Sequence, residues 1–98
     1  MDNKIAVFLV YDRAIDEEVL GALAESSLER FTRWHDASGV GASGPHLGDN
    51  VWPALNNVLL VVAEAEKKDE ILRHIRALQE EFPFTGLRAV VVPVLDMV

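Results

Sequence analysis

The sequence contains no cysteine among its 98 residues. This absence excludes a disulfide framework, a thiolate metal site and a cysteine nucleophile. Basic residues are also few, since nine Lys and Arg stand against sixteen Asp and Glu and give a formal net charge of −7. Such a surface repels the phosphate backbone of nucleic acids unless basic residues cluster, and Arg30 and Arg33 form only a small pair. We therefore expect a cytoplasmic protein with no nucleic acid among its partners.

The chain also lacks a hydrophobic run long enough to cross a bilayer. The strongest candidate, residues 5–11, ends in the charged pair Asp12 and Arg13 and has no small-residue cleavage site after it. A membrane-spanning helix needs about 20 apolar residues, so we expect neither a signal peptide nor direct membrane insertion. Half of all residues are nevertheless hydrophobic. For a single small domain this fraction suggests apolar surface that is buried between subunits.

The hydrophobic pattern predicts two strand–helix–strand halves within one domain, residues 1–98. Strands are expected at 4–11, 28–36, 58–63 and 87–95, and helices at 14–26 and 64–82. Asp12 is expected to cap the first helix and Pro83 to end the second. This order is that of a ferredoxin-like α+β fold, a four-stranded antiparallel sheet with two helices on one face.

The expected strands differ in polarity, which predicts their places in the sheet. Residues 4–11 and 58–63 are apolar on both sides and belong in the centre, whereas the charged strand 28–36 and the strand containing Pro93 belong at the edges. Two helices cover only one sheet face. The other face, which carries either Ile5, Val7 and Leu9 or their alternates, would remain apolar, so we expect the chain to oligomerise through it.

Residues 37–57 contain four of the six glycines and two of the four prolines. We expect this stretch to be a long loop rather than a regular helix or strand. Loops of this length are usually either functional or disordered, and the bulky residues Leu47, Val51 and Trp52 distinguish this one from a simple linker. Its tip, about residues 41–52, is expected to become ordered only when a ligand or partner binds.

In the order and spacing of its segments, the chain resembles a shortened member of the PII family of trimeric signalling proteins. The resemblance rests on residues 4–10 before an acidic helix, on Gly39–His46 at the start of the loop, and on Arg88–Leu95 at the end of the sheet. It implies a homotrimer that is not an enzyme and that senses a small effector in clefts between subunits. It also implies control of a protein partner, such as a membrane transporter or an efflux system, through the loop 37–57.

Two sets of site residues follow from this resemblance and from the chemistry of the side chains. We expect effector binding by Arg33, Trp34, His35, Gly39, Gly41, Ser43, Gly44 and His46. We expect partner binding by the loop residues Leu47, Asp49, Val51 and Trp52. The glycines offer backbone N–H groups to an anion, and an arginine offers a bidentate contact.

The loop has no lysine or arginine, and this absence limits the kinds of effector that it can bind. Nucleotide-binding PII proteins have a basic residue where this chain has Ala42, and only Thr85–Gly86 remains of their lysine-rich phosphate loop. No Lys or Arg occurs between Ser38 and Glu66. Since several phosphate charges need charged donors, we expect adenine nucleotides to bind weakly and a smaller anion or a metal ion to be the effector.

Other functions compete with this one. A metal-binding trimer of the divalent-cation-tolerance type would use His35, Asp36, His46 and Asp49, whose imidazole and carboxylate groups suit zinc or copper. Residues 39–44 match G-x-G-x-x-G, but no helix follows as a dinucleotide site requires. A small ferredoxin-like enzyme would need a converging acid–base pair that the sequence does not offer, so we expect no catalytic residues.

Overall fold

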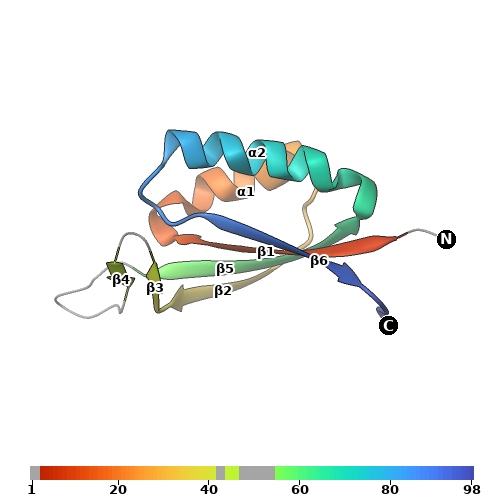
Figure 1. Cartoon of the computed structure of the whole chain (residues 1–98), viewed down its shortest axis with the longest axis horizontal. Helices are drawn as coiled ribbons and strands as arrows, with labels where there is room; N and C mark the ends of the chain where they lie inside the picture. The colour runs from red at the N-terminus through yellow and green to blue at the C-terminus, as the bar shows by residue number, and fades with distance from the viewer. Residues whose placement is uncertain (1–2, 42–43, 47–54) are drawn as a thin grey trace.

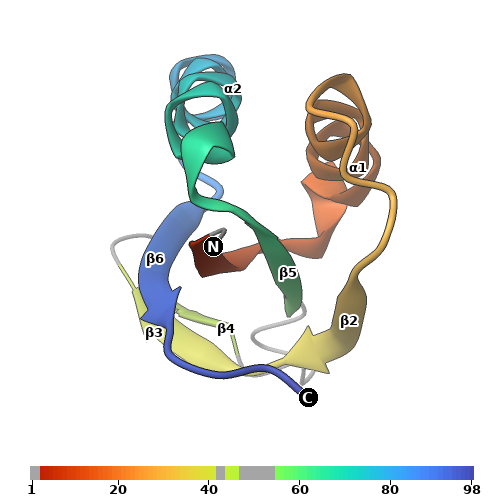
Figure 2. The same ribbon diagram turned by 90° about the vertical axis from the view of Figure 1, so that its right-hand side faces the viewer.

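The computed structural model describes residues 3–41, 44–46 and 55–98, which form a two-layer α+β fold (Figure 1). One layer is a four-stranded antiparallel sheet with strand order β2-β5-β1-β6. The other layer is a pair of helices that lie side by side on one face of this sheet (Figure 2). The strands are β1 Lys4–Asp12, β2 Thr32–Ala37, β5 Asn56–Glu64 and β6 Arg88–Val94, and the helices are α1 Asp16–Glu25 and α2 Lys68–Glu81. The predicted ferredoxin-like fold is confirmed.

The predicted places of the strands in the sheet are also confirmed. The apolar strands β1 and β5 are central, and the charged strand β2 lies at one edge. Strand β6 lies at the other edge, where Pro93 stands opposite Ile5 of β1. An edge strand tolerates proline because one side of its backbone has no ladder partner that needs its N–H.

The ends of the elements differ from the predicted ones. Each helix begins with a 3₁₀ turn, Arg13–Ile15 before α1 and Ala65–Lys67 before α2. Asp12 caps the first of these turns as expected, with its Oδ1 accepting a hydrogen bond from the Ala14 N–H at 2.9 Å. Strand β2 begins at Thr32 rather than at residue 28.

The late start of β2 has a local cause at the end of α1. Ser27 adopts a φ of 60°, and the N–H of Leu28 donates to the Leu23 carbonyl at 2.9 Å. This arrangement is typical of a helix C-terminal cap, in which a residue with positive φ reverses the chain. Leu28 therefore completes the helix end instead of starting the next strand.

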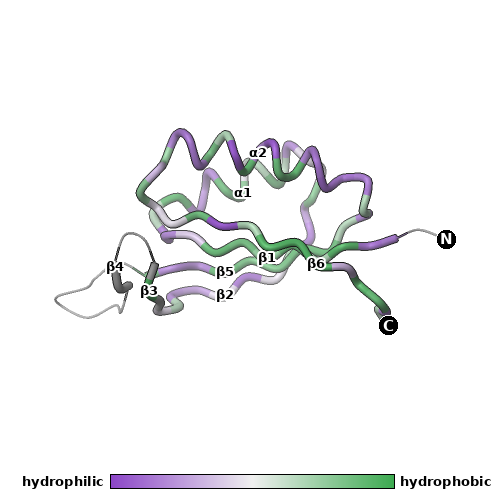
Figure 3. The backbone as a smooth tube through the Cα atoms, in the orientation of Figure 1, coloured by the Kyte–Doolittle hydropathy of each residue, from purple (hydrophilic) through white to green (hydrophobic). Residues whose placement is uncertain are grey.

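The core lies between the helices and one face of the sheet. Alternate residues of β1 and β5 point to this face, and the helices add apolar residues at helical spacing, so that green and purple alternate along α2 in Figure 3. The largest fully buried apolar side chains are Leu9, Leu23, Leu59, Ile71 and Leu87 together with Tyr11. Of the two alternatives that the sequence left open, Ile5, Val7 and Leu9 thus lie under the helices.

The opposite face of the sheet, which we call the open apolar face, has no helix over it in the described part of the chain. It is formed by Phe8, Val10, Trp34, Val58, Leu60, Val62, Val90 and Val92. Across its centre, Phe8 stands between Leu60 of β5 and Val90 of β6. Val90 is 53% and Trp34 49% exposed, an unusual accessibility for such side chains gathered on one surface.

The expectation that residues 37–57 hold no regular strand is wrong. Two short strands, β3 Gly39–Gly41 and β4 Gly44–His46, pair with each other in an antiparallel ladder. Pro45 stands opposite Val40 in this ladder. In a two-stranded ribbon each strand has one unpaired side, so proline is tolerated there. Strand β5 also begins at Asn56, inside the predicted loop.

Candidate functional site

Asp16, the first residue of α1, joins side chains from three strands of the sheet. Its Oδ1 accepts hydrogen bonds from the Tyr11 hydroxyl at 2.6 Å and from Asn57 Nδ2 at 2.9 Å. Its Oδ2 accepts from Arg33 Nη1 at 2.8 Å. We call these four residues the Asp16 cluster. Because one carboxylate satisfies three donors from β1, β5 and β2, it fixes the start of α1 to the end of the sheet where the loop begins.

The charges of the Asp16 cluster are set by burial and by these contacts. Burial alone would raise the pKa of Asp16, but the hydrogen bonds from Tyr11 and Asn57 and the charge of Arg33 lower that pKa further than burial raises it. Burial raises the pKa of Tyr11, and its hydrogen bond to Asp16 raises that pKa further. Near neutral pH the carboxylate is therefore ionised and the phenol protonated. Neither group is poised to exchange a proton, so this pair is unsuited to acid–base catalysis.

This cluster makes a prediction for the pH dependence of stability. A carboxyl group whose pKa is lowered by folding stabilises the folded state at pH values above its unfolded pKa of about 3.9. That contribution is lost as the pH falls through the lower folded pKa. We expect the free energy of unfolding of the wild type to fall more steeply between about pH 5 and pH 2 than that of Asp16→Asn. Urea unfolding at a series of pH values measures this difference, and equal slopes would contradict the assignment.

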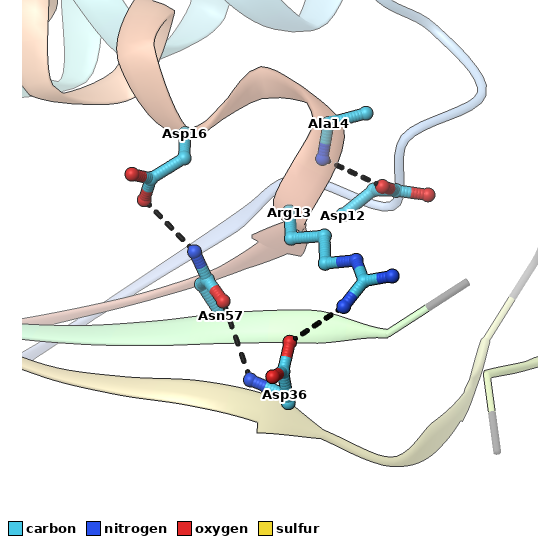
Figure 4. A network of polar contacts seen from close by, with 6 residues as sticks. All are labelled: Asp12, Arg13, Ala14, Asp16, Asp36 and Asn57. Carbon is cyan, nitrogen blue, oxygen red and sulfur yellow. Dashed lines mark hydrogen bonds and ion pairs between the residues drawn. The ribbon is translucent and has the colours of Figure 1, made fainter. Parts of the chain in front are cut away.

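The Asp16 cluster is connected to the beginning of the predicted loop (Figure 4). Asn57 Oδ1 accepts a hydrogen bond from the Asp36 N–H at 3.3 Å, and Asp36 Oδ1 accepts from Arg13 Nη1 at 2.9 Å. Asp36 has a φ of 60° and lies where the register between β2 and β5 shifts, between Trp34 and Ala37. We call Arg13, Asp16, Asp36 and Asn57 the loop-base relay. It links the start of α1 to the last residues of β2.

The structure divides the predicted effector-binding residues among several places. Arg33 lies on the helix face of β2 and is bound to Asp16, with the Phe31 ring 5.9 Å from its guanidinium carbon. Trp34 stands opposite Val58 and so lies on the open apolar face. His35 is exposed, and its charge helps to lower the pKa of Asp16.

The remaining predicted residues lie at or beyond the short hairpin. Gly39 and Gly41 belong to β3, and Gly44 and His46 to β4. Ser43 and the partner-binding residues Leu47, Asp49, Val51 and Trp52 lie outside the described residues.

Sequence reasoning gave no site role to Tyr11, Arg13, Asp16 or Asn57. An acidic residue in the first turn of a helix is explained by the helix dipole alone, which is the interpretation that the sequence suggests for Asp16. The signal that could have been used is the polar pair Asn56–Asn57 at the start of an otherwise apolar strand. A buried asparagine requires hydrogen-bond partners, and Asn57 is only 2% exposed.

Metal binding finds no support among the side chains that the structure describes. No three His, Asp or Glu side chains converge there as a metal ion requires. Asp49 lies outside these residues. A third histidine, His74, links α2 to α1, since its Nδ1 lies 3.2 Å from Glu25 Oε2 and its side chain is 24% exposed.

Comparison with solved structures shows that this chain shares its fold with PII-like proteins. No protein-family model and no curated protein matches the sequence. CPII, a nitrogen regulatory PII-like protein from Thiomonas intermedia K12 solved with ADP, AMP and bicarbonate, has a TM-score of 0.77 at 15% identity, over 94% of this chain and 86% of that one. A putative PII-like signaling protein from Thermus thermophilus has a TM-score of 0.64 at 22% identity, over 96% of this chain and 91% of that one.

A DUF3240 family protein from Shewanella baltica is similar over nearly the whole of both molecules. Its TM-score is 0.73 at 14% identity, covering 100% of this chain and 97% of that one. The strand order and the two helices on one face define a ferredoxin-like α+β protein. Within that class the chain has the PII-like fold. Its described helices include none with the length and hydropathy of a membrane span.

Proposed function

We propose that this protein is a PII-like signalling protein that works without catalysis. In this proposal, three cytoplasmic copies assemble through the open apolar face, and a small effector binds in the clefts between them. The effector then changes the conformation of residues 37–57 and so the affinity for a protein partner, such as a membrane transporter or an efflux system. The observation that carries the proposal is the loop-base relay, which gives a binding event near α1 a direct connection to the end of β2.

The charges at the loop base favour a small anion as the effector over a nucleotide. Two described cations there, Arg13 and Arg33, are each already paired with a carboxylate of the same chain. A triphosphate needs several charge-assisted donors at once, whereas a monoanion needs one guanidinium. CPII was solved with bicarbonate as well as with nucleotides. Bicarbonate is therefore the first effector to test.

Titration calorimetry with ATP, ADP, AMP, bicarbonate and divalent metals tests this proposal. We expect adenine nucleotides to bind with dissociation constants of about 100 μM or weaker, since little positive charge is free to receive them. ATP binding at low micromolar concentration that survives Arg33→Ala would contradict this expectation. Stoichiometric metal binding that is lost in His35→Ala would favour the metal-binding trimer instead.

A further inference from the structure

We propose that the Asp36 carboxylate binds the Arg13 guanidinium in the free protein and that a small planar anion displaces this carboxylate. Asn57 then transmits the exchange to the bulge between β2 and β5. The inference deepens the proposed function and rests on it in one respect, that the effector is an anion. It assigns the regulatory contact to a pair of described residues at the start of the loop. It also predicts that the free protein holds its loop base in an autoinhibited conformation.

The two arginine–carboxylate pairs of the site differ in how easily they can be broken. The Arg13 and Asp36 side chains are 50% and 51% exposed, whereas those of Arg33 and Asp16 are 27% and 21% exposed. Exposed ion pairs contribute little because water and salt screen them. Asp16 also receives two further hydrogen bonds. Arg13 is therefore the guanidinium that an external anion can reach and capture.

The backbone of Asp36 gives this contact a structural consequence. A φ of 60° is uncommon for residues other than glycine, although Asp and Asn tolerate it better than most. Such conformations persist only when surrounding contacts hold them. Here the contacts are the Arg13 guanidinium on the carboxylate and Asn57 Oδ1 on the N–H. Loss of the first leaves the longer second contact, at 3.3 Å, between Asn57 Oδ1 and the Asp36 N–H.

Asn57 occupies the position where the β ladder is interrupted. Trp34 pairs with Val58 and Ala37 with Asn56, so two residues of β2 stand against Asn57. The Asn57 side chain, rather than its backbone, receives the Asp36 N–H, while its Nδ2 donates to Asp16. The amide is thus oriented by a donor on one side and an acceptor on the other. A bulge held by side-chain contacts can change without disturbing the paired residues beyond it.

The exchange conserves charge at Arg13 and breaks no covalent bond. Bicarbonate and carboxylates carry one negative charge on a planar group, as the Asp36 side chain does, and so can accept a hydrogen bond from the Arg13 guanidinium in place of Asp36 Oδ1. The displaced Asp36 carboxylate moves into water. Asp36 is then free to leave the positive-φ conformation, which changes the direction in which Ala37 and Ser38 enter β3.

The experiment combines bicarbonate titration with hydrogen exchange at the Asp36 amide, both at constant pH and ionic strength. We expect bicarbonate to speed exchange at this amide several-fold in the wild type. Asp36→Asn keeps the size and the tolerance for positive φ but removes the charge, so it should bind bicarbonate about two- to fivefold more tightly. Arg13→Gln should bind it about tenfold more weakly. Arg73→Gln, which removes an exposed arginine of α2, is the matched control and should change neither quantity.

The outcomes separate this inference from the proposed function. If bicarbonate and acetate bind neither the wild type nor Asp36→Asn, the proposal of an anion effector is wrong. The proposed displacement of Asp36 from Arg13 is then wrong as well. If bicarbonate binds the wild type, but Arg13→Gln binds it equally well or Asp36→Asn binds it no more tightly, the proposed function stands and the competition is wrong. Unchanged exchange at the Asp36 amide on saturation would overturn the transmission through Asn57.

Discussion

A Leu60→Asp variant is expected to run as single chains of 10.9 kDa, or to fail to fold, whereas the wild type is expected to run as a trimer. Leu60 lies in the middle of the open apolar face, between Phe8 of β1 and Thr32 of β2. In a trimer closed by this face a carboxylate at position 60 would be buried without a partner. Such burial costs several kcal/mol of the free energy that favours association of the subunits, so we expect the trimer to dissociate.

Light scattering on the eluting peak measures the mass, and Ala77→Asp provides the control. Ala77 is exposed on the outer side of α2, so the same charge placed there should leave the trimer intact. A circular dichroism spectrum distinguishes a folded monomer from an unfolded chain. A wild-type protein that is monomeric at micromolar concentration would contradict the proposed trimer outright.

Asp16→Leu is expected to lower the free energy of unfolding by about 2–4 kcal/mol, the largest effect of any polar substitution in the site. The variant removes the acceptor of Tyr11, Asn57 and Arg33 at once. Tyr11 is fully buried and Asn57 nearly so, so neither donor can turn to water. Groups left in this way lose hydrogen bonds without regaining hydration. Chemical denaturation monitored by tryptophan fluorescence gives the difference.

Two further variants test whether the loss comes from these contacts. Glu17→Leu removes an exposed acid from the same first turn of α1 and should cost less than about 1 kcal/mol, since only the helix-dipole interaction is lost. The double variant Asp16→Leu with Arg33→Leu should recover part of the stability lost in Asp16→Leu, because no charged guanidinium remains without its partner. If Glu17→Leu cost as much as Asp16→Leu, the contacts of the Asp16 cluster would not explain the effect.

The sequence was sufficient for the architecture because apolar runs mark the central strands of the sheet. Residues 58–63 are apolar on both sides and so predicted a central strand, and Pro93 predicted an edge strand. The short hairpin was not predictable in this way. Gly39, Gly44 and Pro45 indicate a loop, and only pairing between the two segments makes them strands.

The site was harder to predict because its residues each have an ordinary explanation when taken alone. Asp16 suits any helix start, and Asn57 suits any strand boundary. Arg33 and Trp34 belong to the same predicted effector-binding set. Neighbouring residues on a strand, however, point to opposite faces of the sheet. The alternation predicts that Arg33 belongs with the helices and Trp34 with the open apolar face, and this is where they lie.

The strand order determines when the strands can pair during synthesis of the chain. Strands β1 and β2, on either side of α1, do not touch, because β5 lies between them; β5 and β6 are likewise separated by β1. Each half of the sequence therefore lacks a ladder of its own within this sheet. In a nascent chain that ends before Asn56, β1 has no strand to pair with. The apolar residues of β1 therefore remain exposed to solvent until the second half is synthesised. We infer that the two halves fold together as one unit, and that a truncated half would aggregate rather than fold.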